Sequence, residues 1–137
     1  MRDIPKEIVG ESQEFLQGRV NEYAEASGDH NPIHIDPEYA AATPFKATIV
    51  HGMLVFGVLS EMLATQFGES WRSGASLKVR FRAPIYVGTI VHPRAQLKSD
   101  SIENGEHIVQ YGVTCSDEQG VIFVDGIARI KLSAKRG

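Results

Sequence analysis

Hydrophobic residues in the first half of the chain follow the period of a helix. Phe15, Val20, Tyr23 and Ala24 recur at spacings compatible with a helix. The segment 26–29 that follows reads Ala-Ser-Gly-Asp, and such residues stop a helix and start a turn. The pattern therefore predicts a helix that ends within this segment.

A second helical pattern begins at His51 and is apolar on nearly every side. It runs through Met-Leu-Val-Phe-Gly-Val-Leu at 53–59 and continues to Phe67. A helix of this composition needs protein around it. At about 1.5 Å per residue it is roughly 25 Å long, enough to cross a small domain. We therefore expect His51–Phe67 to form a buried central helix.

Two prolines shape the segment between these helices. Pro32 lacks an amide N–H and restricts the residue before it to extended conformations, which predicts a shaped loop over Asp29–Ile35. Asp36 followed by Pro37 is typical of an N-cap with proline at the first helical position. A short helix is therefore expected to begin here and to end at Ala42.

The hydrophobic period changes to two in the second half of the chain. Over 75–82, Ala, Leu, Val and Phe alternate with Ser, Lys and Arg, which predicts a strand with one covered face. Strand-like sequences continue in three further segments, 91–98, 107–115 and 121–132. The turn sequences Asn-Gly and Asp-Glu-Gln-Gly separate these segments, so the strands are expected to pair antiparallel. The predicted fold is α+β, with one antiparallel sheet wrapped around one long helix.

Composition narrows the class of protein without naming a function. The 137 residues fit a single domain over 1–137. Lys and Arg number 14 against 17 Asp and Glu, a net charge of −3, so no basic field is available for nucleic acid. Cys115 is the single cysteine, which excludes an intrachain disulfide and fits a reducing, cytoplasmic compartment. The apolar stretches are too short for a signal peptide or a membrane span, so no membrane partner is expected.

The predicted loop carries the residues best suited to chemistry. Asp29 and His34 lie five positions apart across an Asn-Pro pair, and such a loop can direct a carboxylate and an imidazole into one cleft. A single water between them would complete an acid–base site. Histidine suits proton transfer because its unperturbed pKa lies near neutrality.

Gly52 offers a different kind of group. At the first turn of a helix the backbone N–H is not used within the helix, and the helix dipole adds partial positive charge there. Glycine also lets a carbonyl group approach the backbone without meeting a Cβ atom. The N–H of Gly52 is therefore a candidate donor to an oxyanion.

Each of these residues also has an ordinary structural interpretation. Asp29 can cap a turn, His34 can be a hydrogen-bonded structural histidine, and Gly52 can simply open a helix. Without the wider pattern around them, these interpretations are the more common ones.

The acidic and imidazole groups of the loop also suggest a metal site. Asp29, His30, His34 and Asp36 carry ligand types that transition metals accept. Pro32 prevents the two histidines from sharing a helix face, and the chain contains no HExxH sequence. We therefore expect no metal.

The wider pattern resembles a known family. The run at 23–36, Tyr-Ala-Glu-Ala-Ser-Gly-Asp-His-Asn-Pro-Ile-His-Ile-Asp, and the run at 49–53, Ile-Val-His-Gly-Met, resemble the hydratase 2 motif of the MaoC-like (R)-specific enoyl-CoA hydratases. The resemblance extends over the whole chain in element order. It implies the hot-dog fold, in which a sheet wraps a long helix.

The resemblance also implies roles for individual residues. Asp29 and His34 would be the catalytic pair, Asn31 would support the site, and the Gly52 N–H would bind the thioester oxygen. Ser60 is similar to a serine that lines the site in some members of the family, although a serine on a buried helix often bonds to a carbonyl one turn earlier. The family often has an apolar residue at the position of His30, which bears on the shape of the acyl pocket.

The activity implied by the resemblance is hydration of a trans-2-enoyl-CoA to an (R)-3-hydroxyacyl-CoA, or the reverse dehydration, without a metal or organic cofactor. Two alternatives stay open: a hot-dog acyl-CoA thioesterase and a non-catalytic module that binds acyl thioesters. The acyl chain length, the direction of the reaction and the carrier, coenzyme A or acyl carrier protein, are not specified by the sequence. A homodimer is expected because a single wrapped sheet leaves strand edges exposed.

Overall fold

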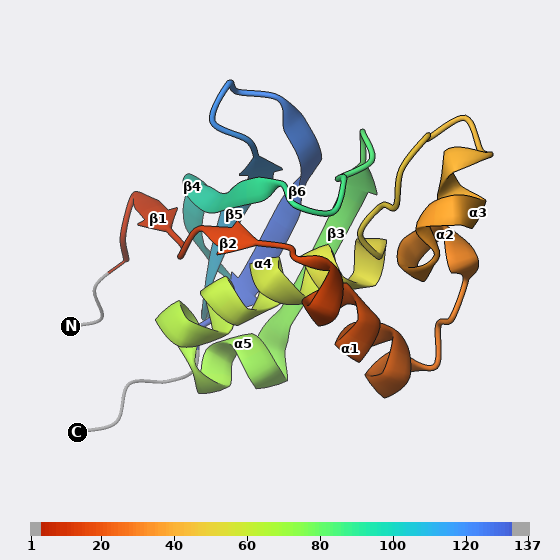
Figure 1. Ribbon diagram of the computed structural model, residues 1–137. Coiled ribbons are helices and arrows are strands. Elements are labelled where there is room, and N and C mark those ends of the chain that lie inside the picture. Colours follow the sequence, from red (N-terminus) through yellow and green to blue (C-terminus); the bar gives the residue numbers. More distant parts are fainter. Residues whose placement is uncertain (1–3, 133–137) are drawn as a thin grey trace.

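The computed structural model describes residues 4–132 of the chain (Figure 1). Helix α4 lies across one face of the sheet, and α2 and α3 lie together at one side of the molecule. Along the chain the elements are β1 (Glu7–Val9), β2 (Gln13–Glu14), α1 (Gln17–Ser27), α2 (Pro32–Ile35), α3 (Pro37–Ala41), α4 (Gly52–Phe67), α5 (Glu69–Gly74), β3 (Ala75–Phe81), β4 (Ile90–Glu103), β5 (Glu106–Ser116) and β6 (Ile122–Lys131).

The sheet is antiparallel throughout, in the order β1-β4-β5-β6-β3, with β2 also paired to β4. Asn104 and Gly105 both have positive φ, 53° and 79°, as the tight turn between β4 and β5 requires. The four long strands predicted from the alternating pattern are all present. Because β3 pairs only with β6, one of its backbone edges is left without a strand partner among residues 4–132.

Helix α4 supplies the centre of the core. Val55, Leu59 and Leu63 recur along one face of the helix and are almost completely buried. The opposite stripe is open to solvent, with Met53 58% exposed. The expectation that protein surrounds this helix is therefore wrong for the single described chain, because its short neighbours cover only part of its circumference.

Local structure in the segment after α1 differs from the sequence prediction. The expected loop over Asp29–Ile35 contains a four-residue helix, α2, with Pro32 as its first residue. The missing N–H of proline costs nothing at that position, and the restriction on the residue before it is met because Asn31 stays extended. Proline thus starts a helix here instead of preventing one.

Three short elements carry no periodic signal and were not predicted. Strands β1 and β2 have three and two residues, and they form only because β4 pairs with them. Helix α5 is stabilised through Trp71, which packs against the core.

Phe15, assigned to a helix by its spacing, lies in the extended segment before α1. There its N–H donates to the carbonyl of Thr89, and its carbonyl accepts from the N–H of Gly88.

Backbone hydrogen bonds bring α2 and the start of α4 together. The N–H of Ile49 donates to the carbonyl of Ile33 at 3.2 Å, and the N–H of Val50 donates to that of Ile85 at 2.8 Å. The segment that leads into α4 is thus fixed between α2 and the connection after β3. None of the helices among residues 4–132 combines the length and apolar character needed to cross a membrane.

Candidate active site

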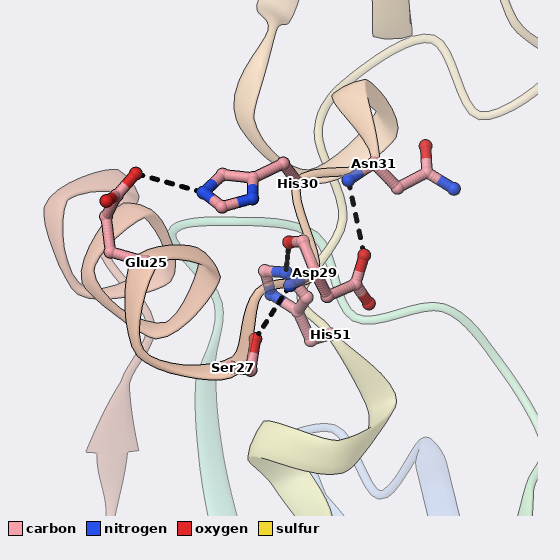
Figure 2. A network of polar contacts seen from close by, with 6 residues as sticks. All are labelled: Glu25, Ser27, Asp29, His30, Asn31 and His51. Atoms are coloured by element: carbon pink, nitrogen blue, oxygen red, sulfur yellow. Dashed lines mark hydrogen bonds and ion pairs between the residues drawn. The ribbon is translucent and has the colours of Figure 1, made fainter.

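The loop that carries Asp29 is built from local hydrogen bonds. Helix α1 ends at Gly28, whose φ of 79° lies in the left-handed region and whose N–H bonds to Ala24. The hydroxyl of Ser27 then accepts from the N–H of Asp29 at 3.2 Å, and the Asp29 carboxylate accepts from the N–H of Asn31 at 3.2 Å (Figure 2). These short-range contacts fix where the Asp29 carboxylate lies.

Asn31 shapes the next turn. Its side-chain oxygen accepts from the N–H of Ile33 at 3.1 Å, which makes it the N-cap of α2. Its side-chain amide lies apart from the Asp29 carboxylate (Figure 2). The observed contact is therefore a supporting one, and direct contact with substrate stays a prediction.

His34 is the residue of α2 that faces the start of α4. Its Nδ1 atom lies 2.8 Å from the carbonyl oxygen of Ile49. Because a carbonyl oxygen only accepts, Nδ1 carries the proton in the neutral ring and Nε2 keeps a free lone pair. No group among residues 4–132 makes a hydrogen bond to Nε2, so this nitrogen is available as a base.

The structure brings Asp29 and His34 together, and it adds a third group. A carboxylate oxygen of Asp29, a ring nitrogen of His34 and a ring nitrogen of His51 all lie within 4.8 Å of one another. Two hydrogen bonds of about 2.8 Å through one water span a gap of this size. The separation of Asp29 and His34 thus suits a single bridging water.

His51 is the site residue to which sequence reasoning assigned no role. Its ring is 2% exposed, stacks on His34 with 3.9 Å between ring centroids, and meets Tyr23 edge-on at 4.8 Å. Its Nε2 atom donates to the backbone carbonyl of Asp29 at 3.0 Å (Figure 2). Burial lowers the pKa of His51, and the neighbouring His34 acts in the same direction. The available signal was a histidine placed just where the apolar helix begins.

Gly52 opens α4 beside His34. Its N–H is the first of the helix and has no acceptor among residues 4–132. A cavity of about 320 Å³ lies against both residues. It is lined by His34, Phe45, Ile49, Val50, Gly52, Val55, Phe81, Arg82, Ala83, Pro84, Ile85 and Val124. The cavity is thus largely apolar, with the Gly52 backbone and the His34 ring in its wall.

A larger hollow, of about 590 Å³, crosses the charged face of the sheet. Lys78, Arg80, Arg94 and Lys98 are among the residues that line it, and none of the predicted site residues is. The smaller cavity is the one that predicted site residues line, namely His34 and Gly52.

Ser60 lies eight residues along α4 from Gly52, about 12 Å at the helical rise. Its hydroxyl accepts from the indole N–H of Trp71 at 2.9 Å, and Ser60 is not among the residues that line the cavity. The structure does not bring it to Asp29 and His34, so its contact with substrate stays a prediction.

His30 lies outside the site. Its Nε2 atom is 3.0 Å from the carboxylate of Glu25 on α1, and its ring points toward that residue and away from His51 (Figure 2). His30 is therefore not among the residues that line the cavity.

The four groups considered as metal ligands are not gathered in one place. His30 pairs with Glu25, and the Asp36 carboxylate caps α3 by accepting from Glu38 and Tyr39. The closer group of Asp29, His34 and His51 places the two imidazole rings face to face, 27° from parallel. Lone pairs of stacked rings run side by side, whereas metal ligands must converge on the ion. This set does not fit a metal without movement of a ring.

The geometry can be set beside known proteins. A family model described as a MaoC like domain matches residues 5–119. Among curated proteins, 3-hydroxybutyryl-CoA dehydratase from Methylorubrum extorquens is 32% identical over 123 residues, 90% of this chain and 76% of that protein. The (R)-specific enoyl-CoA hydratase from Aeromonas caviae is 31% identical over 121 residues, 88% of this chain and 89% of that protein.

Solved structures give the same picture. The (R)-hydratase from A. caviae involved in PHA biosynthesis superimposes with a TM-score of 0.81 at 27% identity, covering 96% of this chain and 98% of that one. An unliganded R-hydratase from Pseudomonas aeruginosa gives 0.78 at 26% identity, covering 99% and 88%. The α+β hot-dog architecture implied by the sequence resemblance is thereby confirmed.

Proposed function

The chain belongs to the MaoC-like family, and from this premise we propose that it catalyses the (R)-specific hydration of a trans-2-enoyl-CoA, or the reverse dehydration of an (R)-3-hydroxyacyl-CoA. The observation that carries the proposal is the meeting of three groups at one apolar cavity. A carboxylate oxygen of Asp29 and a ring nitrogen of His34 lie within 4.8 Å of each other, a separation that one water can bridge, and Gly52, whose N–H has no acceptor among residues 4–132, lines the same cavity as His34.

Gly52 acts on the electrophile. In an enoyl thioester the carbonyl group withdraws electrons from the double bond, so attack at C3 moves negative charge onto the carbonyl oxygen. A preorganised N–H at the start of a helix stabilises this oxygen, and the helix dipole adds to the effect. Residue 52 has no side chain to hinder the approach of the thioester.

Asp29 and His34 act on the water. One O–H of the water donates to the Asp29 carboxylate, and the other donates to Nε2 of His34, which removes that proton as the oxygen bonds to C3. The imidazolium then returns the proton to C2, and the enolate becomes the thioester again. The elements of water are added, no electrons are exchanged with another molecule, and the protein returns to its starting state.

The cavity suits an acyl chain. Its walls come mainly from aliphatic and aromatic side chains, with Phe45, Phe81 and Ile85 among them. Burying an alkyl chain against such walls is favourable by about 25 cal/mol per Å² of apolar surface. The polar end of the substrate would then lie at Gly52 and His34.

The activity is tested directly with crotonyl-CoA. Purified protein is expected to consume the conjugated thioester, followed by its ultraviolet absorbance, and to form (R)-3-hydroxybutyryl-CoA, identified by chiral analysis. A series of longer enoyl-CoA substrates then measures the chain length that the cavity accepts. Absence of turnover with every chain length would contradict the proposal.

The same experiment separates the two alternatives. A thioesterase would release free coenzyme A from butyryl-CoA, which has no double bond to hydrate, and a thiol reagent detects the release. A binding module would hold acyl-CoA without converting it. Cys115 does not supply a covalent route to hydrolysis, because it is buried and burial raises the pKa of its thiol to about 12.

We also propose that the protein is a homodimer. Strand β3 has one edge without a strand partner in the described part of the chain, and at its end Phe81 is 53% exposed although it lines the cavity. A second copy against this edge would cover Phe81 and narrow the cavity mouth. Light scattering at micromolar concentration is expected to give twice the chain mass, and a monomer would contradict this.

A further inference from the structure

His51 occupies a position whose usual role it does not perform. It is the N-cap residue of α4, where Ser, Thr, Asp and Asn are favoured because their side chains accept from the first N–H groups of the helix. The His51 ring makes no such bond, and it is almost completely buried. Its identity therefore needs another physical reason.

The ring of His51 contacts each part of the proposed site. Its Nε2 donates to the backbone carbonyl of Asp29 at 3.0 Å, and its face stacks on the His34 ring at 3.9 Å. Gly52, whose N–H faces the substrate in the proposed mechanism, follows it directly in the chain. One side chain thus links the loop of Asp29, the helix of His34 and the first turn of α4.

The contacts of the ring define its protonation state. Because Nε2 donates to a carbonyl, the neutral ring has a bare Nδ1, and this atom is buried with no partner among residues 4–132. Protonation would create a second N–H with nothing to accept it. The groups that face the ring are Tyr23 from α1, His34 from α2 and Asp29 from the loop, and none of them makes a hydrogen bond to Nδ1.

We propose that His51 is a positioning residue, a neutral imidazole that holds Asp29 and His34 in register with the Gly52 N–H; this inference rests on the proposed function. A neutral ring stacked on His34 also leaves His34 free to accept a proton, because two imidazolium rings face to face would repel. His51 touches no reacting atom in this account. It acts through the two residues that do.

Three variants separate the two contacts. His51→Leu removes both the donor and the aromatic ring. His51→Gln keeps an N–H that reaches toward the Asp29 carbonyl, and His51→Phe keeps the stacked ring. The matched control is His30→Gln. It makes the same chemical change as His51→Gln at an exposed position next to Asp29, and it is expected to keep the wild-type kcat.

We expect His51→Leu to lower kcat for crotonyl-CoA hydration by about 10²-fold, as a misplacement of about 1 Å does, while KM changes by less than about threefold. His51→Gln is expected to recover most of this loss, and His51→Phe part of it. Equal losses in all three variants together with equally lowered melting temperatures would mean a purely structural role and would overturn the proposal. Full activity in all three would also overturn it.

A second readout does not depend on turnover. In ¹⁵N-histidine spectra recorded over a pH series, His51 is expected to stay a neutral Nε2–H ring to a lower pH than a free histidine does, because burial lowers its pKa, and the neutral His34 ring is expected to be the Nδ1–H tautomer. His34 is expected to lose this single tautomer in His51→Leu and to keep it in His30→Gln. If the protein does not hydrate enoyl-CoA but these spectra are observed, the proposed function fails and the positioning role stands. An unchanged His34 tautomer in His51→Leu overturns the positioning role itself.

Discussion

Replacing Asp29 with Asn, or His34 with Asn, is expected to lower kcat for enoyl-CoA hydration by about 10²–10⁴-fold. The first change removes the carboxylate that binds the water and the second removes the base, and each keeps a local hydrogen bond. Asn at 29 can still accept from the N–H of Asn31, and Asn at 34 can still donate to the carbonyl of Ile49. The loss should therefore appear in kcat measured at saturating crotonyl-CoA, with little change in melting temperature.

Glu25→Gln is the matched control for Asp29→Asn. It removes a carboxylate from the same region, but the exposed Glu25 carboxylate makes its only hydrogen bond or ion pair in the described structure with His30. It should keep the wild-type kcat. If Asp29→Asn also retained the wild-type kcat, the assignment of Asp29 to the acid–base pair would be wrong.

Replacing Gly52 with Pro is expected to lower kcat by about 10²–10³-fold relative to Gly52→Ala, the cost of losing one oxyanion donor. Proline removes the N–H and is accepted at the first position of a helix. It also requires an extended residue before it, and His51 already has φ −59° and ψ 132°. The backbone can therefore keep its course while the donor disappears.

Gly52→Ala isolates the effect of adding a Cβ atom. That atom would lie 3.1 Å from the Phe81 ring, which is half exposed and has room to move by a few tenths of an ångström. We expect Ala to reduce kcat less than about tenfold. Equal kcat values for the Pro and Ala variants, with both folded by circular dichroism, would show that the Gly52 N–H does not stabilise the transition state.

The sequence predicted those elements that carry their own periodic signal. Strands β3 to β6 are long enough for their alternating pattern to identify them, and helix α4 is long enough for its run of apolar residues to do so. The Asp36 cap of α3 is local chemistry that a short stretch of sequence contains in full. Strands β1 and β2 are different, because two or three residues have no period and pair only once β4 is folded beside them.

The residues of the candidate site also differ in whether a local sequence pattern can identify them. Asp29, Asn31 and His34 lie within six residues, so a local motif was sufficient to single them out. The role of His51 depends on α1, α2 and the loop meeting at one ring, which no local pattern encodes. For Ser60, the similarity to a family serine did not reveal that the indole N–H of Trp71 bonds to its hydroxyl, and its contact with substrate stays a prediction.

The groups proposed to act on the substrate and the residues of the cavity wall come from different segments of the chain, and this separation affects how the substrate range can change. The groups proposed to act on the substrate belong to Asp29, His34 and Gly52, whereas most of the cavity wall comes from 45–50 and 81–85. The wall is anchored by main-chain bonds, from the N–H of Val50 to the carbonyl of Ile85 and from the N–H of Ile49 to that of Ile33, which persist when side chains change. Substrate range is therefore free to drift, in evolution or by design, through substitutions at Phe45, Phe81 or Ile85 that leave the chemistry intact.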